Sequence, residues 1–226
     1  MAGGVVNEWA HAGERYQRLV ERVHELGGDR VRVVAVTKTF PVEAVEAVRA
    51  VGCDRIGENY ANELIAKVGE IDARSPSRPE VHFIGSVQSN KVRHLAAVVD
   101  VWQTLDRESV IAEVAARRPG ARVLVQVNAT AEPNKGGCVP AATEGLVAAA
   151  LARGLRVEGL MTMGPTHPDL DLTRRAFAAT ARLAGSLGLA DVSMGMSGDW
   201  EVAIDEGSTL IRVGSAIFGD RPPAGR

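Results

Sequence analysis

The chain has 226 residues, a length that fits one large domain or two small ones and that an α/β barrel commonly takes. Hydrophobic residues make up 46% and the formal net charge is −2, which predicts a large core and excludes a strongly basic surface for nucleic acid or acidic lipid. No apolar run approaches the roughly 18 residues of a membrane helix, and the N-terminus lacks a basic region followed by an apolar one, so we expect a soluble cytoplasmic protein.

Cysteines and histidines form no metal-binding motif in this sequence. Cys53 and Cys138 lack the spacing of zinc ligands, and free thiols are the expected state in a reducing compartment. The five histidines are scattered and form no HExxH pair. We therefore expect no metal site.

Helical and strand patterns alternate along the chain. Apolar residues recur at helical spacing from Tyr16 to Leu26, where Gly27 and Gly28 end the pattern, which predicts a leading helix. Short β-branched runs then alternate with amphipathic stretches in eight strand–helix units. The predicted strands are residues 31–37, 54–58, 80–85, 100–105, 121–128, 156–163, 191–195 and 209–214. The predicted helices are residues 41–52, 60–71, 89–98, 107–118, 140–154, 171–188, 199–207 and 215–219.

This alternation predicts a parallel sheet, because each helix crosses back over the strands that it joins. Eight such units close naturally into a barrel. An open doubly wound sheet is the alternative, but the G-x-G-x-x-G turn expected after its first strand is missing, and "TKTFP" stands in its place. We predict an α/β fold, a single (β/α)8 TIM barrel over residues 1–226 with an N-terminal leading helix.

Lys38 ends the first predicted strand, and functional groups of such barrels come from the C-terminal ends of strands. Alternation places Val34, Val36 and Lys38 on one face, which would point the amine into the barrel mouth. Partial desolvation there would lower the lysine pKa from about 10.4 and make the neutral amine available for attack on a carbonyl. The alternative is a lysine at the barrel rim that extends its ammonium group into water.

Two loops of small residues follow the seventh and eighth predicted strands, "SMGMSGD" and "RVGSAIFG". Barrels often build a phosphate site from these two loops. Gly195 and Gly214 would let the backbone approach a ligand closely, and Ser197 and Ser215 could donate hydroxyl groups. The alternative is that glycine and serine are simply good turn residues. Together with a candidate Schiff-base lysine, the loops favour a phosphorylated aldehyde as the ligand.

Five motifs in chain order carry a resemblance to a known family: "AVTKTFP", "IGENYANEL", "HFIGSVQSNK", "GLMTMGP" and "SMGMSGDWEVAIDEGSTLIRVGSAIFG". The chain resembles the YggS/PROSC family of pyridoxal 5′-phosphate (PLP) homeostasis proteins from the first strand to nearly the last residue. The resemblance implies a fold-type III PLP-binding barrel like the N-terminal domain of alanine racemase. It also implies PLP as the cofactor, held as an internal aldimine on Lys38, and a role in intracellular PLP homeostasis.

The resemblance implies further cofactor contacts. Ser197, Gly214 and Ser215 would hold the phosphate, with Ser215 where threonine is frequent, and Arg212 would face the pyridine nitrogen. Asn59 would lie near the ring, and the strand end at Met161 would line the pocket. Pairing of Arg212 with Glu206 is the structural alternative. We assign no catalytic residue, and we expect apo PLP-dependent enzymes as recipients and a monomer or weak dimer.

Other lysines compete with Lys38 for the central role. Lys67 and Lys91 lie on predicted amphipathic helices, where we expect solvated side chains. Lys135 in "NKGG" could belong to an anion-binding nest of backbone N–H groups, and its role stays open.

Three functions fit this pattern: a PLP carrier, a PLP-dependent amino-acid racemase, and a cofactor-free aldolase. A two-base racemase needs acid/base groups on both faces of the substrate carbon. Alanine racemase draws its opposing tyrosine from a second domain, whereas this chain offers Tyr16 and Tyr60. We expect Tyr16 to pack in the core, and the role of Tyr60 stays open. We favour the carrier.

Overall fold

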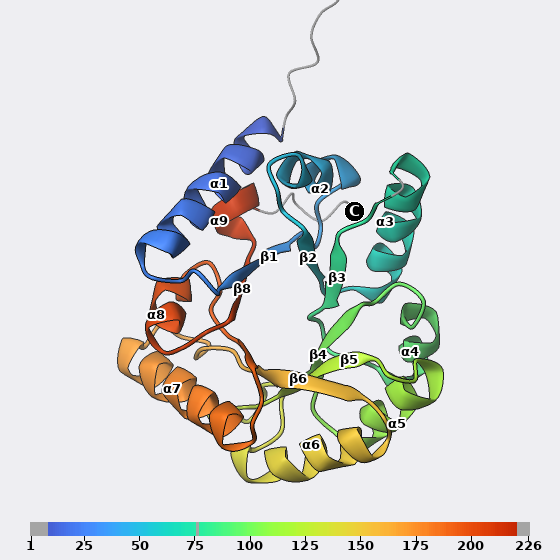
Figure 1. Cartoon of the computed structure of the whole chain (residues 1–226), viewed down its shortest axis with the longest axis vertical. Helices are drawn as coiled ribbons and strands as arrows, with labels where there is room; N and C mark the ends of the chain where they lie inside the picture. The colour runs from blue at the N-terminus through green and yellow to red at the C-terminus, as the bar shows by residue number, and fades with distance from the viewer. Residues whose placement is uncertain (1–8, 76, 221–226) are drawn as a thin grey trace, which may run out of the picture.

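The computed structural model describes residues 9–75 and 77–220. Parallel strands close into a barrel in chain order, surrounded by helices (Figure 1). The strands are β1 (Arg32–Val36), β2 (Arg55–Glu58), β3 (Glu80–Phe83), β4 (Val101–Leu105), β5 (Arg122–Gln126), β6 (Arg156–Met161), β7 (Asp191–Ser193) and β8 (Leu210–Val213). The helices are α1 (Ala10–Glu25), α2 (Val42–Arg49), α3 (Ala61–Arg74), α4 (Ser89–Leu95), α5 (Glu108–Arg117), η1 (Pro140–Ala142), α6 (Thr143–Ala152), α7 (Leu170–Ser186), α8 (Trp200–Asp205) and α9 (Ser215–Phe218).

Pairing of the first strand with the last closes the barrel. β1 pairs in parallel with β8, with Arg32 opposite Leu210 and Ala35 opposite Val213, and it pairs with β2 on its other side. An open doubly wound sheet would leave β1 and β8 unpaired with each other. The predicted (β/α)8 TIM barrel is therefore confirmed, and the open-sheet alternative is wrong.

Burial explains why these segments form strands and helices. β4 is buried at all five positions, as expected for a parallel strand that is covered by helices on one side and by the barrel interior on the other. The helix α3 buries Leu64, Val68 and Ile71, which recur at i, i+4 and i+7 on one face. Because neighbouring strands pair in parallel around the closed barrel, every strand C-terminus lies at the same end.

The leading helix α1 lies outside the barrel, beside α2 and α9 (Figure 1). Tyr16 packs in the cluster that joins α1 to β1, β8 and α9, and burial raises the pKa of its hydroxyl. The prediction of a leading helix with Tyr16 in the core is confirmed. Phe40, just after β1, stacks on Phe218 with ring centroids 4.9 Å apart.

The strands bury polar side chains as well as apolar ones. His82, Gln103, Ser193 and Arg212 are almost completely inaccessible to solvent, although barrel interiors are dominated by Val, Ile and Leu. Cys53 and Cys138 are free, as predicted, and both are buried. Within residues 9–75 and 77–220, no helix is long and apolar enough to cross a membrane.

Candidate functional site

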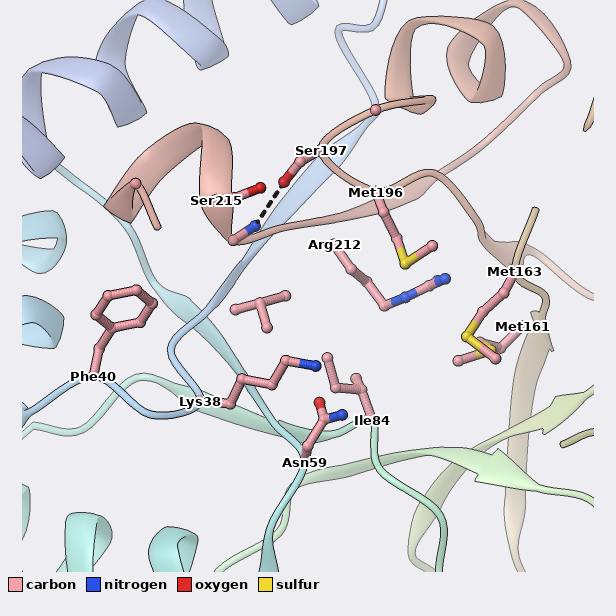
Figure 2. A pocket seen from close by; sticks show the side chains of 14 residues that line it. Lys38, Phe40, Asn59, Ile84, Met161, Met163, Met196, Ser197, Arg212 and Ser215 are labelled. Carbon is pink, nitrogen blue, oxygen red and sulfur yellow. Dashed lines mark hydrogen bonds between the residues drawn. The ribbon is translucent and has the colours of Figure 1, made fainter. Parts of the chain in front are cut away.

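A cavity of about 300 Å³ lies at the C-terminal mouth of the barrel (Figure 2). Small-molecule sites typically span about 300–1,000 Å³, so the cavity has room for a small cofactor. The residues that line it follow the ends of strands or stand on them: Val36, Lys38, Phe40, Asn59, Ile84, Met161, Met163, Met196, Ser197, Gly198, Arg212, Gly214, Ser215 and Gly219. The structure thus brings together all seven residues predicted to contact the cofactor: Lys38, Asn59, Met161, Ser197, Arg212, Gly214 and Ser215. Their contacts with a cofactor stay predictions.

Lys38 lies two residues beyond the end of β1, and its side chain extends into the cavity beside Asn59 and Ile84 (Figure 2). Val36 lines the same cavity, in agreement with the predicted alternation along the strand. The next residue, Thr39, has a left-handed backbone with a φ of 67°. Such a conformation is uncommon outside glycine, so surrounding contacts must stabilise it.

A buried ionic cluster provides those contacts. The Lys67 ammonium group donates to the Thr37 carbonyl at 2.7 Å and pairs with the carboxylates of Glu58 and Glu63. Glu58 also accepts from the Thr37 hydroxyl at 2.6 Å, and Glu63 accepts from the Thr39 N–H at 2.6 Å. The expectation that Lys67 is solvated is wrong: its side chain is 5% exposed.

The charges of this cluster depend on one another. An ammonium group has three protons, and Lys67 directs them to the Thr37 carbonyl and to two carboxylates. Burial raises the pKa of Glu58, and the Lys67 charge opposes that rise. Because the cluster binds both neighbours of Lys38, it fixes the backbone from which the Lys38 side chain enters the cavity.

Small residues shape the opposite side of the cavity, where the loops after β7 and β8 meet. The Ser197 hydroxyl oxygen accepts from the Gly214 N–H at 3.3 Å (Figure 2). It also accepts from the Ala216 N–H at 3.4 Å. A Cβ atom on Gly214 would lie 3.3 Å from Cβ of Val36, so a side chain there would crowd β1. Gly195 has a φ of 96°, and its Cβ would lie 2.6 Å from Ala203. Position 195 therefore requires glycine, whereas a side chain at position 214 would require Val36 to shift by a few tenths of an ångström.

Arg212 also lines the cavity, and it carries a buried charge. The residue is 3% exposed, and burial lowers its pKa to about 10 while the negative charge of Asp199 opposes that change, so the guanidinium stays protonated near neutral pH. It donates to the Ser193 hydroxyl at 2.6 Å and to the Thr162 carbonyl at 2.8 Å. The alternative pairing with Glu206 is wrong, because Glu206 pairs with Arg174 on the outside of the barrel.

Two further charged residues support the mouth of the barrel. Asp199 accepts from the Met196 N–H at 2.5 Å, and burial raises the pKa of its carboxyl group. It belongs to a quoted motif, but nothing in the sequence indicated its proximity to Arg212. Lys135 pairs with Glu132 and donates to the Gly164 carbonyl, so it joins two loops at the mouth.

Neither tyrosine lines the cavity that holds Lys38. Tyr60 is 51% exposed and lines a neighbouring cavity that shares Asn59 with the first one. Tyr16 lies in the core beneath α1. Among the described residues, the lining of the Lys38 cavity therefore contains no phenol that could act as a second acid/base group.

The donor set fits a phosphorylated aromatic aldehyde. Lys38 can supply an amine, Arg212 a charged hydrogen-bond donor, and the Ser197 and Ser215 loops hydroxyl and N–H groups for an anion. Phe40, Ile84 and the methionines form apolar walls for a ring. Within the described part of the chain, the Asn59 Oδ1 atom is buried without a hydrogen-bond partner, so it can accept from a ligand hydroxyl.

Comparisons with known proteins agree with this geometry. The family model "Alanine racemase, N-terminal domain" matches residues 13–222. A "Pyridoxal phosphate homeostasis protein" of Vibrio cholerae is 38% identical over 203 residues, which cover 84% of this chain and 86% of the relative. The structure of PipY from Synechococcus elongatus with PLP bound is similar, with a TM-score of 0.79, 28% identity and coverage of 92% and 100%. Alanine racemase from Corynebacterium glutamicum shares the fold at a TM-score of 0.71 and 18% identity, with coverage of 98% and 63%.

Proposed function

Because the chain belongs to the family of pyridoxal phosphate homeostasis proteins and carries its alanine racemase N-terminal domain, we propose that it binds PLP through Lys38 and releases it again. The observation that carries the proposal is that an amine, a buried guanidinium and two serine loops line one cavity. PLP supplies an aldehyde that can bond to an amine and a ring that can delocalise negative charge. Lys38 would hold the aldehyde end, and Ser197, Gly214 and Ser215 would hold the phosphate.

Arg212 supports a carrier over a racemase. A guanidinium group can only donate hydrogen bonds, so a ring nitrogen that faces Arg212 must accept and stay unprotonated. An unprotonated ring is a poor electron sink, which disfavours removal of a proton from a bound amino acid. The absence of tyrosine from the described lining of the cavity points the same way, since racemisation needs a second acid/base group.

Amino-acid turnover distinguishes the carrier from a racemase. The protein loaded with PLP is incubated with L-alanine, and chiral chromatography measures the D-isomer formed. We expect negligible racemisation by the wild type and more side reactions by a cofactor-loaded Arg212→Glu variant, whose carboxylate would allow the ring nitrogen to be protonated. Rapid racemisation by the wild type would overturn the carrier. A visible band that the protein carries as purified, before any PLP is added, and that borohydride abolishes would exclude a cofactor-free aldolase.

Release is tested by transfer to a second protein. The loaded protein is mixed with an apo PLP-dependent enzyme, and recovery of that enzyme's activity is followed with time. Retention of all cofactor on the carrier would contradict a role in supply. The proposal includes a location in the cytoplasm and a single domain over residues 1–226. It also includes a monomer or weak dimer, and sedimentation equilibrium measures this oligomeric state.

A further inference from the structure

A chain of hydrogen bonds leads from Arg212 through the inside of the barrel. Arg212 donates to the Ser193 hydroxyl at 2.6 Å, and Ser193 donates to Gln103 Oε1 at 2.7 Å. Gln103 Nε2 lies 2.7 Å from His82 Nδ1, and His82 Nε2 lies 2.7 Å from Glu80 Oε1. Because β4 and β7 are not neighbouring strands, the bond between Gln103 and Ser193 crosses the barrel interior.

The two ends of this hydrogen-bond chain fix the direction of its bonds, because Arg212 can only donate and the Glu80 carboxylate can only accept. An arginine can only donate, so the Ser193 oxygen accepts from it and the Ser193 proton goes to Gln103. The Gln103 oxygen is thereby used, and its amide N–H₂ group faces His82 Nδ1, which must accept. The proton of a neutral imidazole then lies on Nε2 and is donated to Glu80. Each donor therefore points away from the cavity.

The far end of the chain lies at the N-terminal face of the barrel. Glu80 begins β3, and its carboxylate also pairs with Arg122 and Arg55. His82 is 1% exposed, and burial lowers its pKa in spite of the neighbouring Glu80 carboxylate. The direction of the hydrogen bonds requires a neutral imidazole at His82, and the lowered pKa of His82 favours the same neutral form.

Stability alone does not explain these residues. Ser193, Gln103 and His82 are buried in a barrel interior where aliphatic side chains would fill the same space. Replacing buried polar networks by well-packed apolar groups is often neutral or stabilising. What an apolar interior cannot do is orient a guanidinium group. Among the residues that the structure describes, two of the five Arg212 N–H groups donate to protein acceptors, the Ser193 hydroxyl and the Thr162 carbonyl.

We propose that Ser193, Gln103 and His82 are positioning residues that fix the orientation of the Arg212 guanidinium, so that it presents a hydrogen-bond donor to the pyridine nitrogen of bound PLP. The inference rests on the proposed function. The Ser193 hydroxyl and the Thr162 carbonyl hold the guanidinium at two points. Gln103 accepts from the Ser193 hydroxyl and so holds it in the rotamer that accepts from Arg212. His82 and Glu80 in turn orient the Gln103 amide.

The test compares PLP with an analogue in which a C–H group replaces the pyridine nitrogen. A hydrogen bond to a charged group makes the wild type prefer PLP by about 10- to 100-fold. We expect Gln103→Leu and Ser193→Ala to reduce this preference to about threefold or less while they leave the affinity for the analogue nearly unchanged. Ser193→Ala removes a single oxygen atom and decides the test if Gln103→Leu does not fold.

Thr104→Val is the matched control. Thr104 neighbours Gln103 on β4 and is buried, but it donates to the Gly85 carbonyl, which is not part of the hydrogen-bond chain from Arg212 to Glu80. It should keep the wild-type preference. The positioning role would be overturned if folded Gln103→Leu and Ser193→Ala variants kept the wild-type preference for PLP, or if they lost affinity equally for PLP and for the analogue. A wild type that binds both ligands equally would overturn it too, whereas failure to bind PLP at all would overturn the proposed function instead.

Discussion

Lys38 and Arg212 face the same cavity, but different kinds of interaction hold them. The backbone on both sides of Lys38 is fixed by an ionic cluster of Lys67, Glu58 and Glu63. Arg212 is itself buried, and its direct partners are a hydroxyl and a carbonyl group, both neutral. The cluster is compact and binds the chain within a few residues of Lys38, whereas the neutral bonds continue across the barrel to Glu80.

The difference fits the roles that we propose for the two cations. In the proposed function Lys38 must reach a carbonyl group, and the ionic cluster fixes the backbone on both sides of it through the partners of Lys67 and Glu63. Arg212 has to remain charged and in one orientation, and a carboxylate paired directly with it would compete with a ligand for its donors. Breaking the ionic cluster should therefore affect stability most, whereas breaking the neutral chain should affect stability less and also change ligand recognition.

The largest expected effect is that of Lys67→Met on stability. Removing one partner of a buried ion pair leaves an uncompensated carboxylate and costs about 3–5 kcal/mol. Urea unfolding followed by circular dichroism measures the loss. Lys91→Met is the control, because Lys91 is half-buried and has no ion pair among the described residues, so we expect a change of about 0.5 kcal/mol or less. Equal effects of the two substitutions would show that the cluster does not stabilise the mouth.

Acid should weaken the far end of the neutral chain next. The pKa of Glu80 is lowered to about 2 by its hydrogen bond with His82 and by Arg122. A lowered carboxyl pKa contributes stability above the unfolded value of about 4.5, and this contribution, at most about 3 kcal/mol, is lost as the pH falls from 4.5 to 2. The lowered pKa of His82 has the same sign, because protonation below about 6.5 favours the unfolded chain.

Urea unfolding at a series of pH values measures this dependence. Glu80→Gln should remove the part of the loss between about pH 4.5 and 2, because glutamine does not titrate. A variant with the same acid profile as the wild type would show that other carboxylates cause the loss.

Ser197→Ala should leave both cations in place and weaken phosphate binding alone. The variant loses a hydrogen bond to a charged acceptor, which costs about 1.5–3 kcal/mol of binding free energy. Fluorescence titration with PLP and with pyridoxal, which lacks the phosphate, separates the two contributions. Pyridoxal should bind the wild type poorly and be nearly indifferent to the substitution. Equal affinity of the wild type for both compounds would refute a phosphate site at the Ser197 loop.

Ser193→Ala should destabilise the fold less than Lys67→Met. Loss of one neutral link leaves polar groups of Arg212 and Gln103 less well satisfied and costs about 1–3 kcal/mol. Thermal unfolding monitored by circular dichroism would measure it beside Lys67→Met. A loss as large as that of Lys67→Met would remove the contrast between an ionic and a neutral support.

The barrel and the residues of its mouth could be predicted because each depends on local pattern. Lys38 and Arg212 interrupt apolar strands, and Ser197 and Gly214 lie in loops after the last two strands. Because all strand ends of a closed parallel barrel meet at one mouth, the prediction of the fold also predicted that these residues meet.

The partners of Lys67 and the contacts across the barrel interior could not be predicted in the same way. Lys67 stands on a helix whose pattern does not distinguish a lysine at the edge of the buried face from one directed at two carboxylates. The bond between Ser193 and Gln103 joins strands that are not neighbours, and it depends on the stagger of the closed sheet. Sequence alternation identifies inward-facing residues but not the partner that each finds across the interior.

The chain contains four lysines, Lys38, Lys67, Lys91 and Lys135, so the attachment site of PLP can be determined directly. The protein is incubated with PLP, reduced with borohydride and digested, and the modified peptide is identified by mass spectrometry. In the wild type we expect one modified residue, Lys38. The Lys38→Ala variant should lack the visible band that borohydride abolishes, and it should retain weaker binding of PLP through the phosphate. Modification of Lys135 or another lysine in place of Lys38, or an undiminished borohydride-sensitive band in the variant, would contradict the assignment of the cavity as a PLP site built around Lys38.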